Sequence, residues 1–471
     1  MYQKTGIYTT ALMLLVLLNN AVAKPNLSIN LNAAPSIIQN QEFPNTYEFE
    51  LDNGLKFIVR KDNRAPVVTT MIWYKIGSVD EPRSLGGISH MLEHMMFKGT
   101  RLADGSLNLQ PNEHSRLISN FGGNDNAFTS RDYTAYFETL PSEHLELAFR
   151  LESDRMQNLN LHDDDFLSER QVVAEERSLR TDSDPQAKFF EQFNAFIWNT
   201  SGYRNPVIGY ANEIQAYKLD DLRAWYTAYY APNNATVVVV GDVDVAKTLE
   251  LAQQYFGGLA RREVKPLALN FEIKQQGLKR MDFQIEAKTP LLVMSYKAPS
   301  INTLDDPKDA DALLMLAAIL DGGRSSRLSK SLVREQKIAA SVSANYDSSP
   351  RFGSTFSFYA IPSNNVDLTV IENAILAEID KLKKIPVSTD ELKRINAQLR
   401  AVMVYQQDSL MSQASMLGAA QTTGEGWVKR EKMIQRLSQI SADDILNVAQ
   451  KYLIDTSLSI GTLTPLKAQL K

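Results

Sequence analysis

The sequence predicts layered α and β structure in two similar halves, and three observations lead to this prediction. Short runs of alternating apolar residues at 47–51 and 55–59 flank an Asp-Asn-Gly turn signal at 52–54. Helical patterns alternate with strand patterns along the chain. A helix-then-strand scheme at 219–243 returns about 222 residues later, at 441–464. At 471 residues with 44% apolar content, the chain is long enough for two to four domains, each with its own core.

The composition excludes several classes of site. The net charge of −5 gives no reason to expect a nucleic acid as partner. The chain has no cysteine, which excludes disulfides, zinc sites built from thiolates and cysteine nucleophiles.

Residues 1–23 have the pattern of a cleavable signal peptide. Lys4 precedes an apolar run at 11–18, and Ala21-Val22-Ala23 matches a signal-peptidase site. The run has eight residues, whereas a bilayer span needs roughly 20, so an uncleaved anchor is the weaker alternative. We therefore expect cleavage after Ala23 and a periplasmic or secreted protein.

The predicted elements follow in order. A polar tail at 24–44 precedes the first two strands, a third strand is expected at 67–76 and another at 236–240. After the Gly-rich segment 122–126, the alternation from Ala127 to Thr139 predicts one strand.

The repeat defines the expected domains. A first α+β domain is expected at 45–258, a linker at 259–269 and a second α+β domain at 270–471.

The histidines concentrate the chemistry in the first half. His90 and His94, four residues apart on a predicted helix, would project from one face and can chelate one tetrahedral cation. Glu93 falls on the same side and is the natural general base, and ligands without thiolate suit zinc best. The alternative is a pair of histidines satisfied within an amphipathic helix. All five histidines precede residue 163: His90, His94, His114, His144 and His162.

A third metal ligand is expected on the acidic helix at 163–180. Glu169 and Glu176 are two helical turns apart and face the same way, whereas Glu175 points about 100° away from Glu176. Periodicity alone does not choose between Glu169 and Glu176. Without the histidine pair, a solvated acidic face would be the simpler interpretation.

Three motifs in order resemble the pitrilysin (M16) metallopeptidases, whose shorter members include mitochondrial processing peptidases and exported bacterial homologues. The motifs are the segments 90–100, 126–130 and 169–176. The resemblance spans essentially the whole mature chain. It implies an α+β fold of two related halves, each a mainly antiparallel sheet packed with helices, that close around a peptide.

The same resemblance implies roles for individual residues. His90, His94 and Glu176 would bind one Zn²⁺, Glu93 would be the catalytic base, and Glu169 would orient the site from outside the ligand set. The strand that includes Asn126 and Phe128 would be an edge strand that pairs with the peptide backbone. These two residues and Arg334 in the second half are the expected substrate-binding residues.

The second half carries no equivalent metal site. Its counterpart of the acidic helix is expected at 389–404, with Ile395 and Val402 in the register of the two glutamates. The resemblance assigns substrate holding to the Gly-rich turn at 321–328 and to Arg334, although the turn is also typical of a helix entry.

The second half also departs from the family pattern. Members of the family carry a Tyr about seven residues after the Arg, but here Ala340 falls near that position, and Tyr346 is expected to point inward from a strand. The incomplete clamp predicts a related partner subunit without the histidine motif, or a homodimer.

The sequence therefore predicts an exported zinc metalloendopeptidase. It would hydrolyse peptides or unfolded polypeptides through zinc-activated water, with Glu93 as the general base, as the catalytic subunit of a two-subunit enzyme. The alternative is a non-catalytic structural or assembly subunit that retains the fold.

Overall fold

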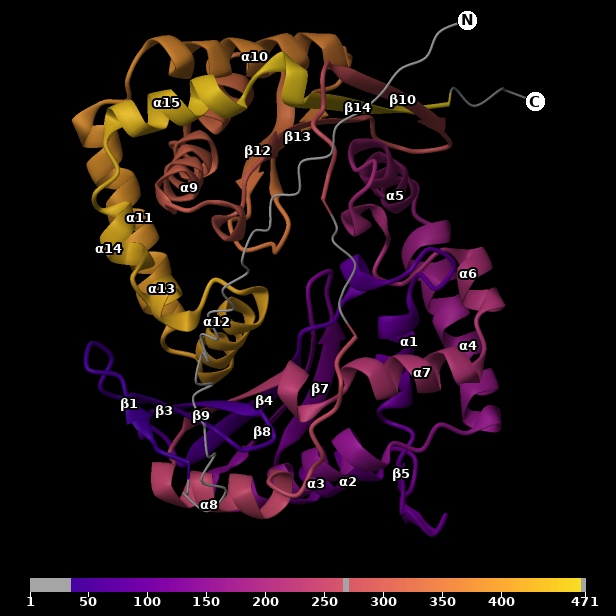
Figure 1. Cartoon of the computed structure of the whole chain (residues 1–471). Coiled ribbons are helices and arrows are strands. Elements are labelled where there is room, and N and C mark those ends of the chain that lie inside the picture. Colours follow the sequence, from indigo (N-terminus) through magenta and orange to yellow (C-terminus); the bar gives the residue numbers. More distant parts are fainter. Residues whose placement is uncertain (1–34, 266–270, 467–471) are drawn as a thin grey trace, which may run out of the picture. The chain divides into compact units, whose positions relative to one another are not determined.

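A computed structural model describes residues 35–265 and 271–466 of the chain (Figure 1). The predicted leader at 1–23 and its cleavage site lie outside the described residues. Residues 35–44 of the predicted tail include the short strand β1, which pairs with β2. Among the described residues, no helix combines the length and apolar character needed to cross a bilayer.

Two sheets form the framework. The first has the strand order β1-β2-β3-β9-β4-β8-β7, and the second has the order β10-β14-β11-β13-β12. The strands of the first sheet are β1 Ile38–Gln39, β2 Thr46–Glu50, β3 Lys56–Lys61, β4 Val67–Tyr74, β7 Asn124–Thr129, β8 Thr134–Pro141 and β9 Ala235–Gly241. Those of the second are β10 Lys279–Ile285, β11 Leu291–Ala298, β12 Ala339–Tyr346, β13 Ser354–Pro362 and β14 Leu458–Pro465. A small separate pair contains β5 Thr100–Arg101 and β6 Leu107–Leu109.

Helices connect and cover these strands. In the first part of the chain they are α1 Ile88–Met95, α2 Glu113–Asn120, α3 Leu145–Asn158, α4 Asp163–Arg177, α5 Pro185–Ile197, α6 Ala211–Ala216, α7 Leu219–Tyr229 and α8 Val245–Phe256. In the second they are α9 Lys308–Asp321, α10 Leu368–Lys384, α11 Thr389–Gln406, α12 Leu410–Thr423, α13 Trp427–Glu431, α14 Met433–Leu437 and α15 Ala442–Tyr452.

The strand order confirms two related halves. Strand β9 lies parallel to β3 and antiparallel to β4, and β14 lies parallel to β10 and antiparallel to β11. The second sheet therefore repeats the order β3-β9-β4-β8-β7 of the first, with α7–β9 and α15–β14 as the repeated helix-then-strand units. The α+β prediction is confirmed, while the domain boundaries at 258 and 270 stay predictions.

One predicted strand is wrong. The alternation from Ala127 to Thr139 is split into the hairpin β7–β8. The Ser130 Oγ accepts hydrogen bonds from the backbone N–H groups of Asp132 and Tyr133, at 3.2 and 3.3 Å, and the Ser130 N–H donates to the Tyr133 carbonyl. These local bonds reverse the chain within an otherwise alternating sequence.

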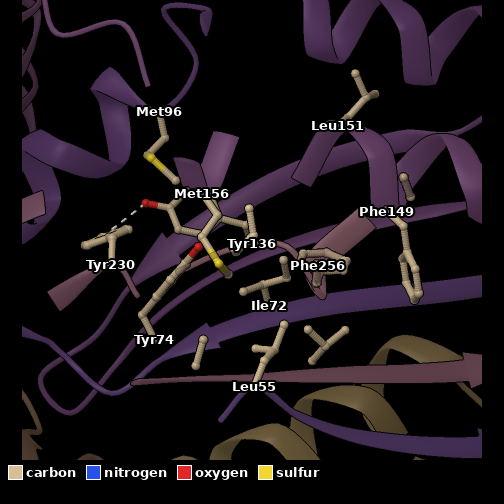
Figure 2. Packing of buried hydrophobic residues seen from close by; sticks show 14 of the residues in the cluster. Leu55, Ile72, Tyr74, Met96, Tyr136, Phe149, Leu151, Met156, Tyr230 and Phe256 are labelled. Carbon is tan, nitrogen blue, oxygen red and sulfur yellow. Dashed lines mark hydrogen bonds between the residues drawn. The ribbon is translucent and has the colours of Figure 1, made fainter. Parts of the chain in front are cut away.

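The first core lies between the first sheet and the helices on one of its faces. Figure 2 shows part of it, with Phe149 of α3 and Phe256 of α8 over the strands and a hydrogen bond between the hydroxyls of Tyr136 and Tyr230, 3.3 Å apart. This core supports α1, because Ile88, Met91, Leu92 and Met95 are fully buried in it.

The opposite face of each sheet is covered by a helix from the other half (Figure 1). Helix α12 packs on β9 and β4, and α5 packs on β10 and β14. Both contacts depend on a glycine, since a Cβ on Gly418 of α12 would collide with the Trp73 indole, and a Cβ on Gly461 of β14 would collide with the Phe193 ring. The halves thus exchange helices: α5 of the first half packs on the second sheet, and α12 of the second half packs on the first sheet.

Candidate metal centre

Helix α1 carries the histidine pair, and Glu81 fixes where this helix begins. The two carboxylate oxygens of Glu81 accept hydrogen bonds from the Gly87 N–H at 2.7 Å and the Ser89 N–H at 2.9 Å. A carboxylate at a helix N-terminus satisfies free N–H groups and interacts favourably with the helix dipole. Burial nevertheless raises the pKa of Glu81 to about 7. With the helix start fixed, the rings of His90 and His94 lie 4.7 Å apart, centroid to centroid.

Helix α4 brings both candidate glutamates to the histidines, at different nitrogens. Oε2 of Glu176 lies 3.3 Å from Nε2 of His94 and 3.7 Å from Nε2 of His90. Oε1 of Glu169 instead lies 2.8 Å from Nδ1 of His94. Glu175 is exposed, as its helical position predicts. Periodicity left Glu169 and Glu176 equivalent, whereas the geometry separates them.

Basic side chains hold the two glutamates. Nζ of Lys98 is 2.5 Å from Oε2 of Glu169, and Arg180 is 2.7 Å from Oε1 of Glu176. Each glutamate therefore uses one carboxylate oxygen for a cation and presents the other to the histidines.

The pKa values of the histidines differ because their partners differ. Burial lowers the pKa of His90 to about 3, and its buried Nδ1 has no hydrogen-bond partner among the described residues. Burial also acts to lower the pKa of His94, but the hydrogen bond and charge of Glu169 outweigh it, so this pKa lies above its usual value. A neutral His90 is in the form that a metal ion requires.

Glu93 is held by the edge strand β7. The Thr129 hydroxyl donates a hydrogen bond of 2.5 Å to Oε2 of Glu93. Burial raises the pKa of Glu93, which the hydrogen bond from Thr129 partly offsets. A carboxylate with a raised pKa is a better proton acceptor near neutral pH than an exposed one.

The donor set fits a tetrahedral zinc ion. Zinc bonds of about 2.0–2.1 Å to nitrogen in tetrahedral geometry separate neighbouring ligand atoms by about 3.3 Å. The separations of 3.3 and 3.7 Å from Oε2 of Glu176 to the two Nε2 atoms are close to that value. Within the described ranges, His90, His94 and Glu176 form a group whose ligand atoms all lie within 4.8 Å of one another.

The group opens into a cavity of about 960 Å³. Every described residue that lines this cavity lies between His90 and Ile208, in the first half. Strand β7 forms part of its wall and is an edge of the first sheet. Since the Ser130 N–H bonds to the Tyr133 carbonyl just before β8, strand alternation turns the backbone groups of Ala127 and Thr129 toward the free edge.

The expected substrate-binding residues have different surroundings. Asn126 and Phe128 both line the cavity. The Asn126 Oδ1 accepts a hydrogen bond from the Ala127 N–H at 2.8 Å, and the Phe128 ring packs edge-on to Trp73, 5.6 Å away. Arg334 is exposed and is not part of the cavity wall.

The second half matches its predicted elements. Helix α11 covers the expected range, with Ile395 buried and Val402 exposed. Tyr346 is buried on β12, and its hydroxyl donates to the Pro299 carbonyl, so the predicted inward orientation is confirmed. The Gly-rich turn at 321–328 follows the end of α9 and leads into a π-helical turn at Ser329–Glu335.

Sequence reasoning missed the groups that orient the centre. Thr129 lies in the quoted strand motif, but nothing in its spacing indicates contact with Glu93, because that contact depends on β7 packing beside α1. Lys98 lies four residues after His94 and could have been considered on helical spacing.

Comparisons with known proteins agree with this geometry. A model described as "Insulinase (Peptidase family M16)" matches residues 56–210, and one described as "Peptidase M16 inactive domain" matches residues 216–399. A zinc protease named PqqE from Helicobacter pylori is 32% identical over 423 residues, covering 88% of this chain and 92% of that protein. The chain belongs to peptidase family M16.

Two further similar proteins extend the comparison. The crystal structure of a protease from Helicobacter pylori superposes with a TM-score of 0.82 at 30% identity, covering 89% of this chain and 99% of that one. The beta subunit of a mitochondrial-processing peptidase from Lentinula edodes is 24% identical, covering 87% of this chain and 88% of the subunit. The fold and the M16 resemblance predicted from the motifs are thereby confirmed.

Proposed function

We propose that this chain is a zinc metalloendopeptidase that hydrolyses peptides or unfolded polypeptides. The observation that carries the proposal is the convergence of Nε2 of His90, Nε2 of His94 and Oε2 of Glu176 on one point of a cavity. These three residues would hold one zinc ion. When bound, zinc would supply a Lewis acid that lowers the pKa of a water molecule and polarises a carbonyl.

The protein's own groups supply the remaining steps. Glu93 accepts the proton of the attacking water at a carboxylate oxygen and later delivers it to the leaving amine. Thr129 keeps Glu93 in place through its hydrogen bond to Oε2. Glu169 fixes the orientation of the His94 ring at Nδ1, so that Nε2 stays directed at the metal position.

The free edge of β7 would hold the substrate. An extended peptide beside this edge would donate main-chain hydrogen bonds to the outward carbonyls of Ala127 and Thr129, which do not depend on its side chains, while the Ala127 N–H stays bonded to Asn126 Oδ1. Thr129 contributes its backbone to this edge and its hydroxyl to Glu93, which would align the peptide with the base. Asn126 and Phe128 would then contribute contacts from the wall of the cavity.

The test is metal content and peptide cleavage by the purified mature chain. We expect about one zinc per chain by elemental analysis, cleavage of a mixed peptide library, and loss of cleavage on chelation with recovery on added zinc. Cleavage that persists without zinc would overturn the zinc mechanism. Zinc binding without cleavage of any peptide, with or without other subunits, would favour the non-catalytic structural subunit.

The incomplete substrate clamp in the second half supports the proposal of a partner subunit. No described residue of the second half lines the metal cavity, Arg334 is exposed, and Ala340 occupies the position expected for a tyrosine. We propose a related M16 subunit without the histidine motif, with a homodimer as the alternative. Carbonyl-binding donors are worth about 10²- to 10³-fold in rate. We expect the isolated chain to be weakly active. Adding an extract of cells that lack this chain should raise its cleavage rate by that factor. Full activity of the pure, monomeric chain would exclude a partner.

Export to the periplasm or outside the cell belongs to the same proposal. It rests on the apolar run at 11–18 and the Ala21-Val22-Ala23 site. N-terminal sequencing of the protein recovered from the producing cell should begin at Lys24.

A further inference from the structure

A second cavity adjoins the metal centre at the end of β7. It has a volume of about 470 Å³ and lies between the β7–β8 turn, helix α5 and the strands of the second sheet. Thr129 lines the metal cavity and Ser130, the next residue, lines the second one. A peptide that follows the edge of β7 past Thr129 is therefore directed toward the second cavity.

Arg131 in the wall of this cavity has an uncommitted guanidinium. Among the residues that the structure describes, none forms an ion pair or a side-chain hydrogen bond with it. Burial lowers its pKa, and the charges of Asp132, Tyr203 and Tyr359 oppose that effect without cancelling it. A half-buried cation without a partner is costly, and arginine is the residue best suited to bind a carboxylate with two parallel hydrogen bonds.

The neighbouring acid does not neutralise Arg131. Oδ1 of Asp132 accepts hydrogen bonds from the Tyr203 hydroxyl at 2.7 Å and from Nε of Arg351 at 3.1 Å, and Arg351 also pairs with Asp80. The carboxylate of Asp132 thus belongs to a contact between the two halves.

The opposite wall is polar and comes from the second half. Ser295 and Ser357 present hydroxyls that are 2.7 Å apart, and Thr355 and Tyr359 lie beside them. Asp347 also lines the cavity, where its Oδ1 accepts hydrogen bonds from the backbone and hydroxyl of Ser349. The wall can donate hydrogen bonds from its hydroxyls but offers no cation of its own among the described lining residues.

We propose that this cavity binds a carboxylate of the peptide substrate, with Arg131 as its partner. The proposal rests on the proposed peptidase function and adds a specificity to it. The carboxylate is either an Asp or Glu side chain beyond the scissile bond or the C-terminus of a short peptide. A strand advances about 3.3 Å per residue, so the group is expected within a few residues of the position opposite Thr129.

The experiment measures a ratio rather than an absolute rate. Pairs of peptides that differ by Glu or Gln at successive positions, and pairs that differ by a C-terminal acid or amide, are cleaved by the zinc-loaded enzyme. We expect one position or the C-terminus to favour the carboxylate by about 10-fold in kcat/KM, as for a hydrogen bond to a charged group. The two sets of peptides distinguish the side chain from the C-terminus.

Variants assign the ratio to Arg131. Arg131→Gln should reduce the ratio to about 1, and Arg131→Lys should retain part of it because the charge remains. Arg83→Gln, which removes an exposed arginine charge elsewhere in the first half, should leave the ratio unchanged. Thermal unfolding of each variant shows that it is folded.

The outcomes separate the two proposals. Cleavage by the wild type without any carboxylate preference, or a preference retained in Arg131→Gln, would overturn the Arg131 subsite and leave the peptidase intact. Absence of zinc-dependent cleavage of every peptide would overturn the peptidase itself. Fluorescence anisotropy with labelled peptides and Glu93→Gln provides a readout without turnover, in which the carboxylate peptides should again bind about 10-fold more tightly.

Discussion

The two halves of the chain have the same strand order but different chemistry. In the first half the helix after β4 is α1, with His90, Glu93 and His94. In the second half the helix after β11 is α9, whose buried residues are mostly leucines and alanines. Helix α4 presents Glu169 and Glu176, whereas α11 carries Ile395 and Val402 in the expected register. Apolar alternation common to both halves builds the sheets, and a few polar side chains decide which half has a site.

The largest expected effect distinguishes the halves directly. Glu93→Gln removes a proton acceptor and no metal ligand, so we expect the fold and zinc to remain and kcat to fall by roughly 10²- to 10⁴-fold. The same change at Glu286, an exposed residue of the second half, should leave kcat unchanged. Steady-state kinetics and elemental analysis check both, and a Glu93→Gln rate within a few-fold of the wild type would refute the assignment.

The next effect separates the two glutamates of α4. Glu176→Gln should weaken zinc binding more than Glu169→Gln, because Glu176 is at the Nε2 atoms and Glu169 only at Nδ1 of His94. Changes outside the ligand set typically reduce affinity by about 10- to 100-fold. Competition with a zinc chelator measures both, with Glu175→Gln as the exposed control, and the reverse order would exchange their roles.

A third prediction tests the exchange of α5 and α12 between the halves. Gly418→Ala and Gly461→Ala should each destabilise the protein by about 1–3 kcal/mol, because the new methyl groups meet Trp73 and Phe193. Gly258→Ala, whose Cβ would meet no atom within 4 Å, is the control. Chemical unfolding gives the values. Unchanged stability in both core variants would mean that the helices do not pack so closely in solution.

The smallest effect concerns the pH dependence of α1. The folded pKa of Glu81, about 7, lies above its unfolded value, so its stabilising contribution is complete below pH 4.5 and is lost as the pH rises through 7. Between pH 6 and pH 8 the wild type should lose about 1 kcal/mol more than Glu81→Gln, which does not titrate. Chemical unfolding at both pH values measures the difference, and parallel losses in the two proteins would show that Glu81 does not titrate in this range.

Local patterns predicted much of this molecule. Spacing identified His90, Glu93 and His94, and apolar patterns located the strands predicted at 47–51, 55–59, 67–76 and 236–240 near their observed bounds. The hairpin at Ser130 was missed because its turn is formed by a serine hydroxyl within an alternating run. Helical periodicity left Glu169 and Glu176 undecided because both face the histidines. The M16 resemblance assigned Glu176 to the metal, and the packing of α4 on α1 shows which His94 nitrogen each glutamate faces. Contacts such as Thr129 with Glu93 join distant segments that no local pattern connects.

The exchanged helices have a consequence for how the chain is synthesised. During translation, β4 and β9 are complete long before α12 has left the ribosome, so one face of the first sheet, with Trp73, Met71 and Val238, lacks its cover until then. Exposed apolar sheet faces are prone to aggregate, and contacts between distant segments form slowly. Truncation before α12 should therefore yield an aggregation-prone first half rather than an independent domain. A separately expressed second half, by supplying α12, should rescue its solubility.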